Sequence, residues 1–123
     1  MVGFRWDLAV NQTYEVASLY TYGQPRVGNF EWAVAYDKHV PNTWRIVHSH
    51  DIVPHIPMVS LDFFHSQFEV FYPGDTTEPY TVCDSTGEDG KCSNHCAHDF
   101  SCTSIIDHLW YMGVPTAGSD ACV

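Results

Sequence analysis

Two side chains of the sequence stand where a carboxylate and an imidazole could act as a pair. Asp51 closely follows an apolar run that ends at His48, and catalytic loops gather at such strand ends in open α/β sheets. His108 follows a loop and lies in the first turn of a predicted short helix, where the neutral imidazole is favoured and suits a general base. A carboxylate can orient such a base and stabilise its protonated form. Considered alone, each residue is at least as well explained by ordinary turn chemistry or by a histidine at a helix end.

The elements that would carry Asp51 are predicted by a strand–helix–strand pattern. Residues 16–22 are apolar and aromatic over a short run, which is typical of a buried strand. Residues 29–40 are predicted as a helix, because Asn29 suits the N-cap and Pro41 prevents continuation. Residues 44–48 are predicted as a second strand. This order indicates a βαβ unit, and therefore a parallel sheet with a right-handed crossover.

The rest of the chain predicts less regular elements around this unit. In chain order they are the end of a helix at 1–10, antiparallel edge strands at 64–72 and 80–84, a cysteine loop at 84–103 and a helix at 104–113. The start of the last helix rests on Ser104 and Asp107, which have the spacing of a capping box. No internal repeat or linker is found, so residues 1–123 are treated as one domain.

Size and charge exclude several classes of protein. With 123 residues, 45% of them hydrophobic, the chain has the composition of one small globular domain. Fifteen acidic residues against five basic ones argue against a nucleic-acid binder, which needs a basic surface. No run of 18 apolar residues is present, so no transmembrane segment is predicted. No cofactor is predicted either.

Cysteines are concentrated in the last third of the sequence. They are Cys83, Cys92, Cys96, Cys102 and Cys122. Four of them fall in one segment rich in Gly, Ser and Asp, which favours disulfides and an oxidising compartment. Asn11 begins a glycosylation acceptor triplet, which agrees with that compartment.

A zinc site is the alternative interpretation of the same segment. Its thiolate and imidazole ligands would come from Cys92, His95, Cys96, His98 and Cys102. Structural zinc sites usually show two separated ligand pairs, and one compact cluster does not match that pattern. We therefore predict disulfides and no metal site.

Three separated blocks of the sequence closely resemble the class 3 (fungal-type) lipase family. The first block is YTYGQPRVGN at 20–29, which is similar to the family's segment after the nucleophile helix. The second is RIVH at 45–48 with DIVPHIP at 51–57, similar to the strand and loop that carry the acid. The third is IDHLWYMG at 106–113, similar to the segment that carries the base. Together the blocks span roughly residues 16–114, and the order of acid and base agrees with that of α/β-hydrolases.

The resemblance implies an α/β-hydrolase fold, of which the chain would be the C-terminal portion: a mainly parallel sheet with flanking helices and a disulfide loop. It also implies that Asp51 is the acid and His108 the base of a catalytic triad. The family has Pro where this chain has Ile52, a change expected to affect loop rigidity rather than chemistry.

The nucleophile of the implied triad is absent from the sequence. The family places its serine in a G-x-S-x-G elbow, and no such motif occurs in the 123 residues. Ser18 and Ser49 are the only serines before Asp51, and neither has flanking glycines. We therefore expect the nucleophile, the oxyanion hole and the lid to precede residue 1, and this chain alone to lack triad catalysis.

The resemblance also implies how the cysteines pair. Cys83 and Cys92 have the spacing of a loop disulfide found in some members, and Cys96 and Cys102 would close a second loop. Cys122 is then left unpaired, with a partner expected in the region before residue 1. The first residues show no export signal, which also leads us to expect a missing front part.

The function implied by the resemblance is that of a secreted ester hydrolase acting on acylglycerols or related lipid esters. The first alternative is a non-catalytic lipase-like protein with a binding or regulatory role. The second is a small secreted module held by cysteines or zinc, which the βαβ pattern and the three ordered blocks disfavour.

Overall fold

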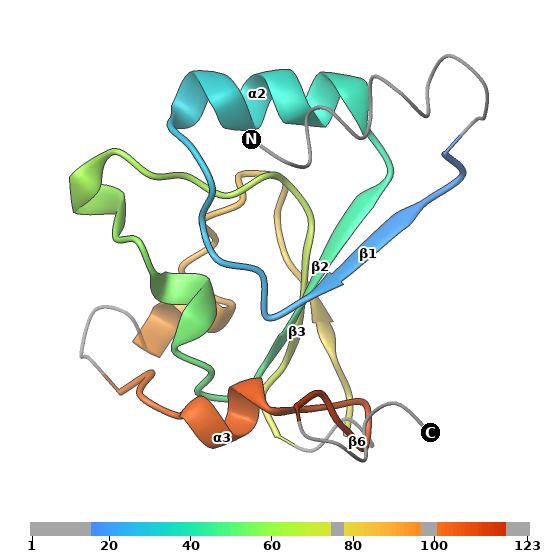
Figure 1. Cartoon of the computed structure of the whole chain (residues 1–123), viewed down its shortest axis with the longest axis vertical. Helices are drawn as coiled ribbons and strands as arrows, with labels where there is room; N and C mark the ends of the chain where they lie inside the picture. The colour runs from blue at the N-terminus through green and yellow to red at the C-terminus, as the bar shows by residue number, and fades with distance from the viewer. Residues whose placement is uncertain (1–15, 75–77, 97–100, 118–123) are drawn as a thin grey trace.

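The computed structural model of the chain describes residues 16–74, 78–96 and 101–117. The predicted helix end at residues 1–10, the acceptor Asn11 and the leftover Cys122 lie outside the described residues. In the described part a small sheet crosses the molecule, and the longest helix lies at the top of Figure 1.

The sheet has four strands in sequence order. They are β1 (Leu19–Tyr22), β2 (Thr43–His48), β3 (Glu69–Tyr72) and β4 (Thr81–Val82). β1, β2 and β3 are parallel, and β4 is antiparallel to β3. The predicted βαβ unit is confirmed, because β1 and β2 are parallel and joined through a helix. β2 ends towards the bottom of Figure 1, where the short helix α3 (Ile105–His108) lies.

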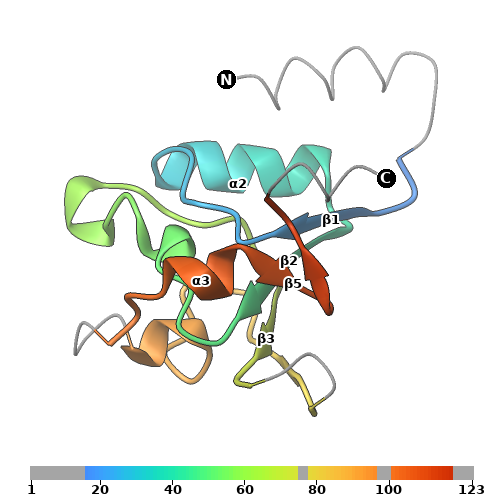
Figure 2. The same ribbon diagram turned by 60° about the horizontal axis from the view of Figure 1, so that its bottom comes forward.

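The crossover helix α2 (Phe30–His39) has the predicted boundaries. It begins after Asn29, whose side-chain oxygen accepts a hydrogen bond from the backbone N–H of Trp32 at 3.0 Å. Ala33 and Tyr36 are buried on one face of the helix, three residues apart as one helical stripe requires. The helix therefore packs by this side. In Figure 2, α2 lies just above β1.

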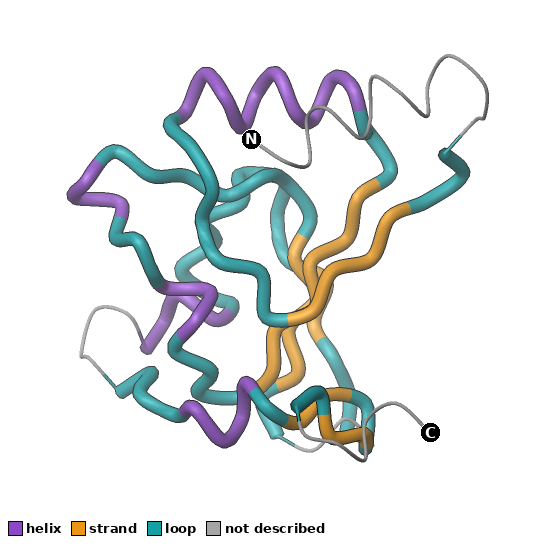
Figure 3. The backbone as a smooth tube through the Cα atoms, in the orientation of Figure 1, coloured by secondary structure: helices purple, strands orange, loops and turns teal. Residues whose placement is uncertain are grey.

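A long connection joins β2 to β3 and contains two short 3₁₀ turns, η1 (Val53–His55) and η2 (Val59–Leu61). Figure 3 shows it as mostly loop beside the sheet. The strand predicted at 64–72 was wrong in its first half, because β3 begins only at Glu69. Phe68 has φ 58°, a left-handed conformation that an extended strand cannot contain.

The segment after β4 holds η3 (Ser93–Cys96), α3, β5 (Trp110–Tyr111) and β6 (Val114–Pro115). The helix predicted at 104–113 begins as expected, since the Ser104 hydroxyl accepts from the Asp107 N–H at 3.0 Å. It ends at His108, however, and the chain then forms a tight hairpin through Met112 and Gly113, both with positive φ. His108 thus lies in the first turn of a short helix, as predicted, but the expectation that the helix continues to residue 113 was wrong.

The apolar core lies on both sides of β2. Ile46 contacts Val70 and Tyr111 on one side, whereas Val47 packs with Phe71 and the Cys83–Cys92 pair on the other. The alternation of neighbouring side chains along a strand explains this division. Among the described residues, none of the helices is both long and apolar enough to cross a bilayer.

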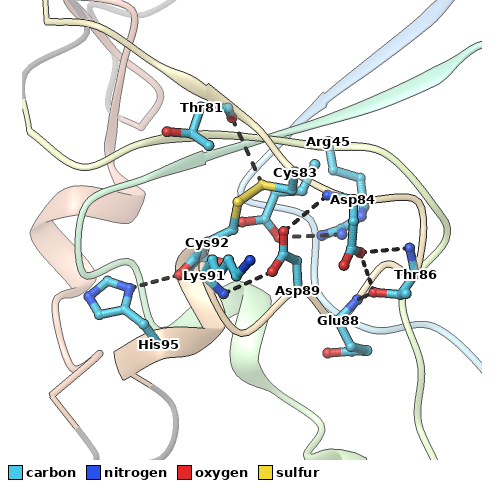
Figure 4. Close-up of a disulfide and its surroundings, with 12 residues drawn as sticks. Arg45, Thr81, Cys83, Asp84, Thr86, Glu88, Asp89, Lys91, Cys92 and His95 are labelled. Atoms are coloured by element: carbon cyan, nitrogen blue, oxygen red, sulfur yellow. Dashed lines mark hydrogen bonds and ion pairs between the residues drawn. A yellow bond between two sulfur atoms is a disulfide. The ribbon is translucent and has the colours of Figure 1, made fainter.

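Two disulfides are formed, between Cys83 and Cys92 and between Cys96 and Cys102. Figure 4 shows the first with the loop that it closes. Asp89 shapes this loop, because its carboxylate accepts the backbone N–H groups of Asp84 at 3.0 Å and Lys91 at 2.9 Å. The loop is therefore held by its own side chains as well as by the disulfide.

A buried ion pair ties the disulfide loop to the segment after β1. Arg26 donates two hydrogen bonds to the carboxylate of Glu88, at 2.8 and 2.7 Å, and a third to the backbone oxygen of Pro57 at 3.0 Å. Glu88 also accepts from the Asn94 side chain at 2.7 Å. Burial alone would raise the pKa of Glu88, but the hydrogen bonds and charge of Arg26 outweigh it and lower the pKa to about 2.

Acid is expected to unfold the protein partly through Glu88. The folded-state pKa lies below the usual 4.5, so the stabilisation by Glu88 is complete above pH 4.5 and is lost as the pH falls towards 2. Its size is about 3 kcal/mol at neutral pH. Urea unfolding at several pH values should show a smaller loss of stability between pH 4.5 and 2 in Glu88→Gln than in the unmodified protein. Glu31→Gln, at an exposed position of α2, is the control and should leave the slope unchanged; an unchanged slope in Glu88→Gln would contradict the prediction.

Candidate active site

Asp51 lies three residues beyond the end of β2 and is completely buried. Its backbone N–H bonds the oxygen of His48 at 3.0 Å, so the chain turns sharply as the strand ends. Its Oδ1 accepts the N–H of Val53 at 2.8 Å. These two bonds fix the carboxylate at the C-terminal edge of the parallel strands, which is the position where such sheets place catalytic groups.

His108 meets this carboxylate from α3. Its Nδ1 lies 3.0 Å from Oδ2 of Asp51, and its side chain is 31% exposed. With the carboxylate ionised, the Nδ1–H group donates this hydrogen bond, so the lone pair is on Nε2. A buried carboxylate that holds a partly exposed imidazole in one tautomer is the arrangement that a general base needs.

Further hydrogen bonds join the loop that carries Asp51 to the segment that carries His108. The N–H of His50 donates to Oδ2 of Asp107 at 3.0 Å. The N–H of Ser104 donates to the oxygen of His50 at 3.0 Å, and that of Ile52 to the oxygen of Ser104 at 3.3 Å. The two segments are far apart in sequence, and these bonds set the distance between acid and base.

Tyr111 is a site residue that the sequence did not identify. Its hydroxyl donates to Oδ2 of Asp51 at 2.5 Å and accepts the N–H of His48 at 3.3 Å. Burial raises the pKa of Tyr111, and the hydrogen bond to Asp51 raises it further, so the hydroxyl remains a donor. The sequence placed Tyr111 on a helix, whereas the hairpin of β5 and β6 turns it towards Asp51.

Gly23 supplies the space in which the pair meets. It follows β1 with φ 58°. A Cβ atom here would lie 2.6 Å from Nδ1 of His108 and 2.8 Å from Oδ2 of Asp51. Any other residue would therefore displace the acid or the base, and the strand end must be glycine for two reasons: its backbone conformation and its missing side chain.

Gly23→Ala is expected to impair the site more than Gly113→Ala does. Both glycines have positive φ, and both variants incur roughly 1–2 kcal/mol of backbone strain. A Cβ at Gly113 meets nothing within 4 Å, so only Gly23→Ala displaces His108. Compared with Gly113→Ala, we expect Gly23→Ala to lower kcat/KM of the native protein about 100-fold further. Unfolding of both variants in urea is measured on the same samples. Equal loss of activity in the two variants would contradict this role of Gly23.

The side chains of the other histidines near the acid loop form no hydrogen bond with Asp51 or His108 among the hydrogen bonds of the described residues. His48 lies with Nδ1 3.2 Å from the oxygen of Asp107, and His65 with Nε2 2.7 Å from that of Pro54. In the described part of the chain, two groups of three side chains lie close enough together to bind a metal ion. Neither group includes Asp51 or His108.

The structure brings together the two residues that the sequence proposed, Asp51 and His108, although they are 57 residues apart. Their catalytic roles remain predictions. Ile52, where the related family has Pro, begins the turn into η1 and has an ordinary helical φ of −76°.

Comparisons with known proteins agree with this arrangement. The family described as Lipase (class 3) matches residues 5–61. A curated relative, Lipase ZK262.3 of Caenorhabditis elegans, is 35% identical over 134 residues, which cover 83% of this chain and 37% of the relative. Lipase II from Rhizopus niveus superposes with a TM-score of 0.75 at 32% identity, covering 90% of this chain and 42% of that one.

A second solved structure is a triacylglycerol lipase whose catalytic centre is formed by a serine protease triad. It superposes with a TM-score of 0.75 at 36% identity and covers 89% of this chain and 42% of that one. The chain thus spans less than half the length of each of these proteins. Its sheet, helices and disulfides are those of an α/β-hydrolase fold, and the chain belongs to the class 3 lipase family.

Proposed function

We propose that Asp51 and His108 are the acid and the base of a Ser-Asp-His triad in a secreted hydrolase of acylglycerols or related lipid esters. The observation that carries the proposal is the 3.0 Å contact between Nδ1 of His108 and Oδ2 of the fully buried Asp51. The sequence contains no G-x-S-x-G motif, so the proposed triad requires a serine from outside these 123 residues.

The geometry gives each group a step in the reaction. Nε2 of His108 takes the proton of the serine hydroxyl while the serine oxygen attacks the ester carbonyl carbon. The same proton then passes to the oxygen of the leaving alcohol, and water repeats the sequence to release the fatty acid. Asp51 stabilises the imidazolium that forms twice in this cycle, and Tyr111 with the Val53 N–H keeps its carboxylate oriented.

The surface around the pair supports a lipid substrate. Large apolar side chains are exposed there: Ile105, Ile106 and Leu109 beside His108, and Ile56 and Met58 in the loop after Asp51. The Ile106 side chain is 78% exposed although it lies two residues from the base. Clustered exposed apolar residues mark binding sites more often than chance, and acyl chains are the part of a lipid ester that such a surface would contact.

The two disulfides support a secreted location. Disulfides persist in oxidising compartments and are rare in reducing ones. Cys83–Cys92 and Cys96–Cys102 both lie in the described part of the chain, and the first is packed in the core.

The test is to label the native protein with a fluorophosphonate, which reacts with an activated serine. The 5′ end of its transcript and its intact mass should be determined on the same material. We expect hydrolysis of a soluble nitrophenyl ester and of an emulsified triacylglycerol, with the label on a serine outside residues 1–123. His108→Ala should abolish labelling and hydrolysis while the protein remains folded.

Two results would overturn the proposal. One is a native protein that neither hydrolyses esters nor takes the label; the other is labelling that His108→Ala leaves unchanged. If the first result is accompanied by binding to vesicles of neutral lipid, the non-catalytic lipase-like role replaces the enzyme.

A further inference from the structure

Three metal-ligating side chains converge in a group that includes neither Asp51 nor His108. They are His55 at the end of η1, Cys96 at the end of η3, and Cys102, six residues further along the chain. Their ligand atoms, one from each residue, all lie within 4.8 Å of one another. All three side chains also line a cavity of about 690 Å³ that contains Asn94 and apolar residues of the acid loop.

Among these three residues, His55 is buried without a hydrogen bond that would explain its position. It is only 8% exposed, yet neither of its ring nitrogens forms a hydrogen bond in the described part of the chain. A buried polar group without a partner costs about 1–3 kcal/mol. The nearby buried His65 differs, because its Nε2 contacts the oxygen of Pro54 at 2.7 Å.

Asn94 lines the same cavity, and its side chain lies next to the ring of His55. The amide oxygen of Asn94 accepts a hydrogen bond from Arg26 at 3.3 Å, and its NH₂ group donates one to Glu88 at 2.7 Å. Both ends of this amide therefore already have partners other than His55.

A second cluster of donors shows by contrast why His55 matters. Glu69, Cys83 and Cys92 also lie within reach of one another. Both oxygens of Glu69 are occupied, one by the Ser93 N–H at 3.0 Å and the other by Arg45 at 3.4 Å. In that cluster the carboxylate of Glu69 already has hydrogen-bond partners. In the other cluster the ring nitrogens of His55 have none among the described residues.

We propose that His55, Cys96 and Cys102 form a zinc-binding site that opens when the Cys96–Cys102 disulfide is reduced. A dithiol or phosphine reductant gives two electrons to the S–S bond and is itself oxidised. The two thiols then lose their protons and bind Zn²⁺ as thiolates, together with one nitrogen of His55. The fourth position faces the cavity and is filled by water, as in zinc sites with three protein ligands.

The distances and charges suit this set of ligands. Ligand atoms at about 2.3 Å (sulfur) and about 2.0 Å (nitrogen) from one metal ion lie within about 4 Å of one another, and the three ligand atoms here are already within 4.8 Å of one another. Two thiolates neutralise the charge of Zn²⁺, so the occupied site is neutral overall. A neutral site avoids most of the cost of burying an isolated charge and does not disturb the neighbouring pair of Arg26 and Glu88, which line the same cavity.

The test uses the purified native protein, reduced without oxygen, and zinc alone as the probe. We expect one Zn²⁺ per chain by elemental analysis, and a thiolate charge-transfer band when Co²⁺ replaces it. Two matched double variants assign the site: Cys96→Ser with Cys102→Ser should abolish binding, whereas Cys83→Ser with Cys92→Ser should retain it. Circular dichroism of each variant checks that the fold is kept.

His55 is tested separately against His95, a neighbouring histidine outside the cluster. His55→Ala should weaken zinc binding by more than the roughly 10–100-fold that loss of an outer-shell partner costs, and His95→Ala should not change it. The proposal is overturned if the reduced protein binds no zinc. It is equally overturned if binding survives His55→Ala or depends on His95, His98 or the Cys83–Cys92 pair instead.

Discussion

Asp51→Asn is expected to lower kcat for ester hydrolysis by the native protein about 10⁴-fold. An amide at this position can turn its NH₂ group towards His108, and Nδ1 must then accept the bond rather than donate it. The proton moves to Nε2, which can no longer take a proton from a nucleophile. The bond from the Val53 N–H to Oδ1 can be kept by an amide, so the loop should remain folded. The measurement is steady-state kinetics, with thermal unfolding of the same samples.

Asp107→Asn is the matched control for this prediction. Asp107 adjoins the base and accepts a hydrogen bond from His50, but it does not contact the imidazole of His108 through its carboxylate. We expect it to reduce kcat less than tenfold, consistent with the loss of one ordinary hydrogen bond. A loss of less than tenfold in Asp51→Asn itself would show that Asp51 is not the acid of the site.

The part of the fold that local chemistry determines was predictable from the sequence. Asn29 and Pro41 set the ends of α2, and the apolar run before His48 gave β2. Each of these signals acts within a few residues of where it is read. The proximity of Asp51 and His108 was predictable for another reason: the resemblance to the class 3 lipases supplied the tertiary pairing that local rules do not contain.

The errors occurred where the backbone takes a conformation that its residue types do not favour. Phe68 and Met112 both have positive φ, a region that bulky residues rarely enter. Phe68 delays the start of β3, and Met112 helps to turn the chain back into the β5–β6 hairpin. Neither conformation follows from propensity: Phe68 stacks on Trp44, and Met112 forms the turn between β5 and β6 together with Gly113.

The same limit explains which site residues were missed. Tyr111 contributes to the site only because the hairpin directs its hydroxyl to Asp51, and the sequence predicted a helix there. Gly23 follows the strand predicted at 16–22, but the sequence does not show that a side chain at this position would meet His108 and Asp51. The bonds from Arg26 to Glu88 span 62 residues, and no periodicity in the sequence points to such a pair.

The second large effect is expected from Arg45, the most deeply buried cation of the described chain. Its guanidinium is fully buried and donates to the oxygens of Ser66 and Gly87, each at 2.9 Å, and to Glu69 at 3.4 Å. Arg45→Met removes all three bonds and leaves Glu69 buried without its cation. We expect a loss of about 3–5 kcal/mol in the free energy of unfolding, measured in urea.

A double variant separates the two contributions to that loss. Arg45→Met with Glu69→Leu removes the unpaired carboxylate as well, so it should be more stable than Arg45→Met alone, and the double-mutant cycle should give a coupling of about 0.5–3 kcal/mol. Lys38→Met on the exposed side of α2 is the control and should change stability by less than about 0.5 kcal/mol. A loss below about 1 kcal/mol in Arg45→Met would mean that water reaches Glu69 once the arginine is gone. Arg45 would then fill space between β2 and the disulfide loop rather than balance a buried charge.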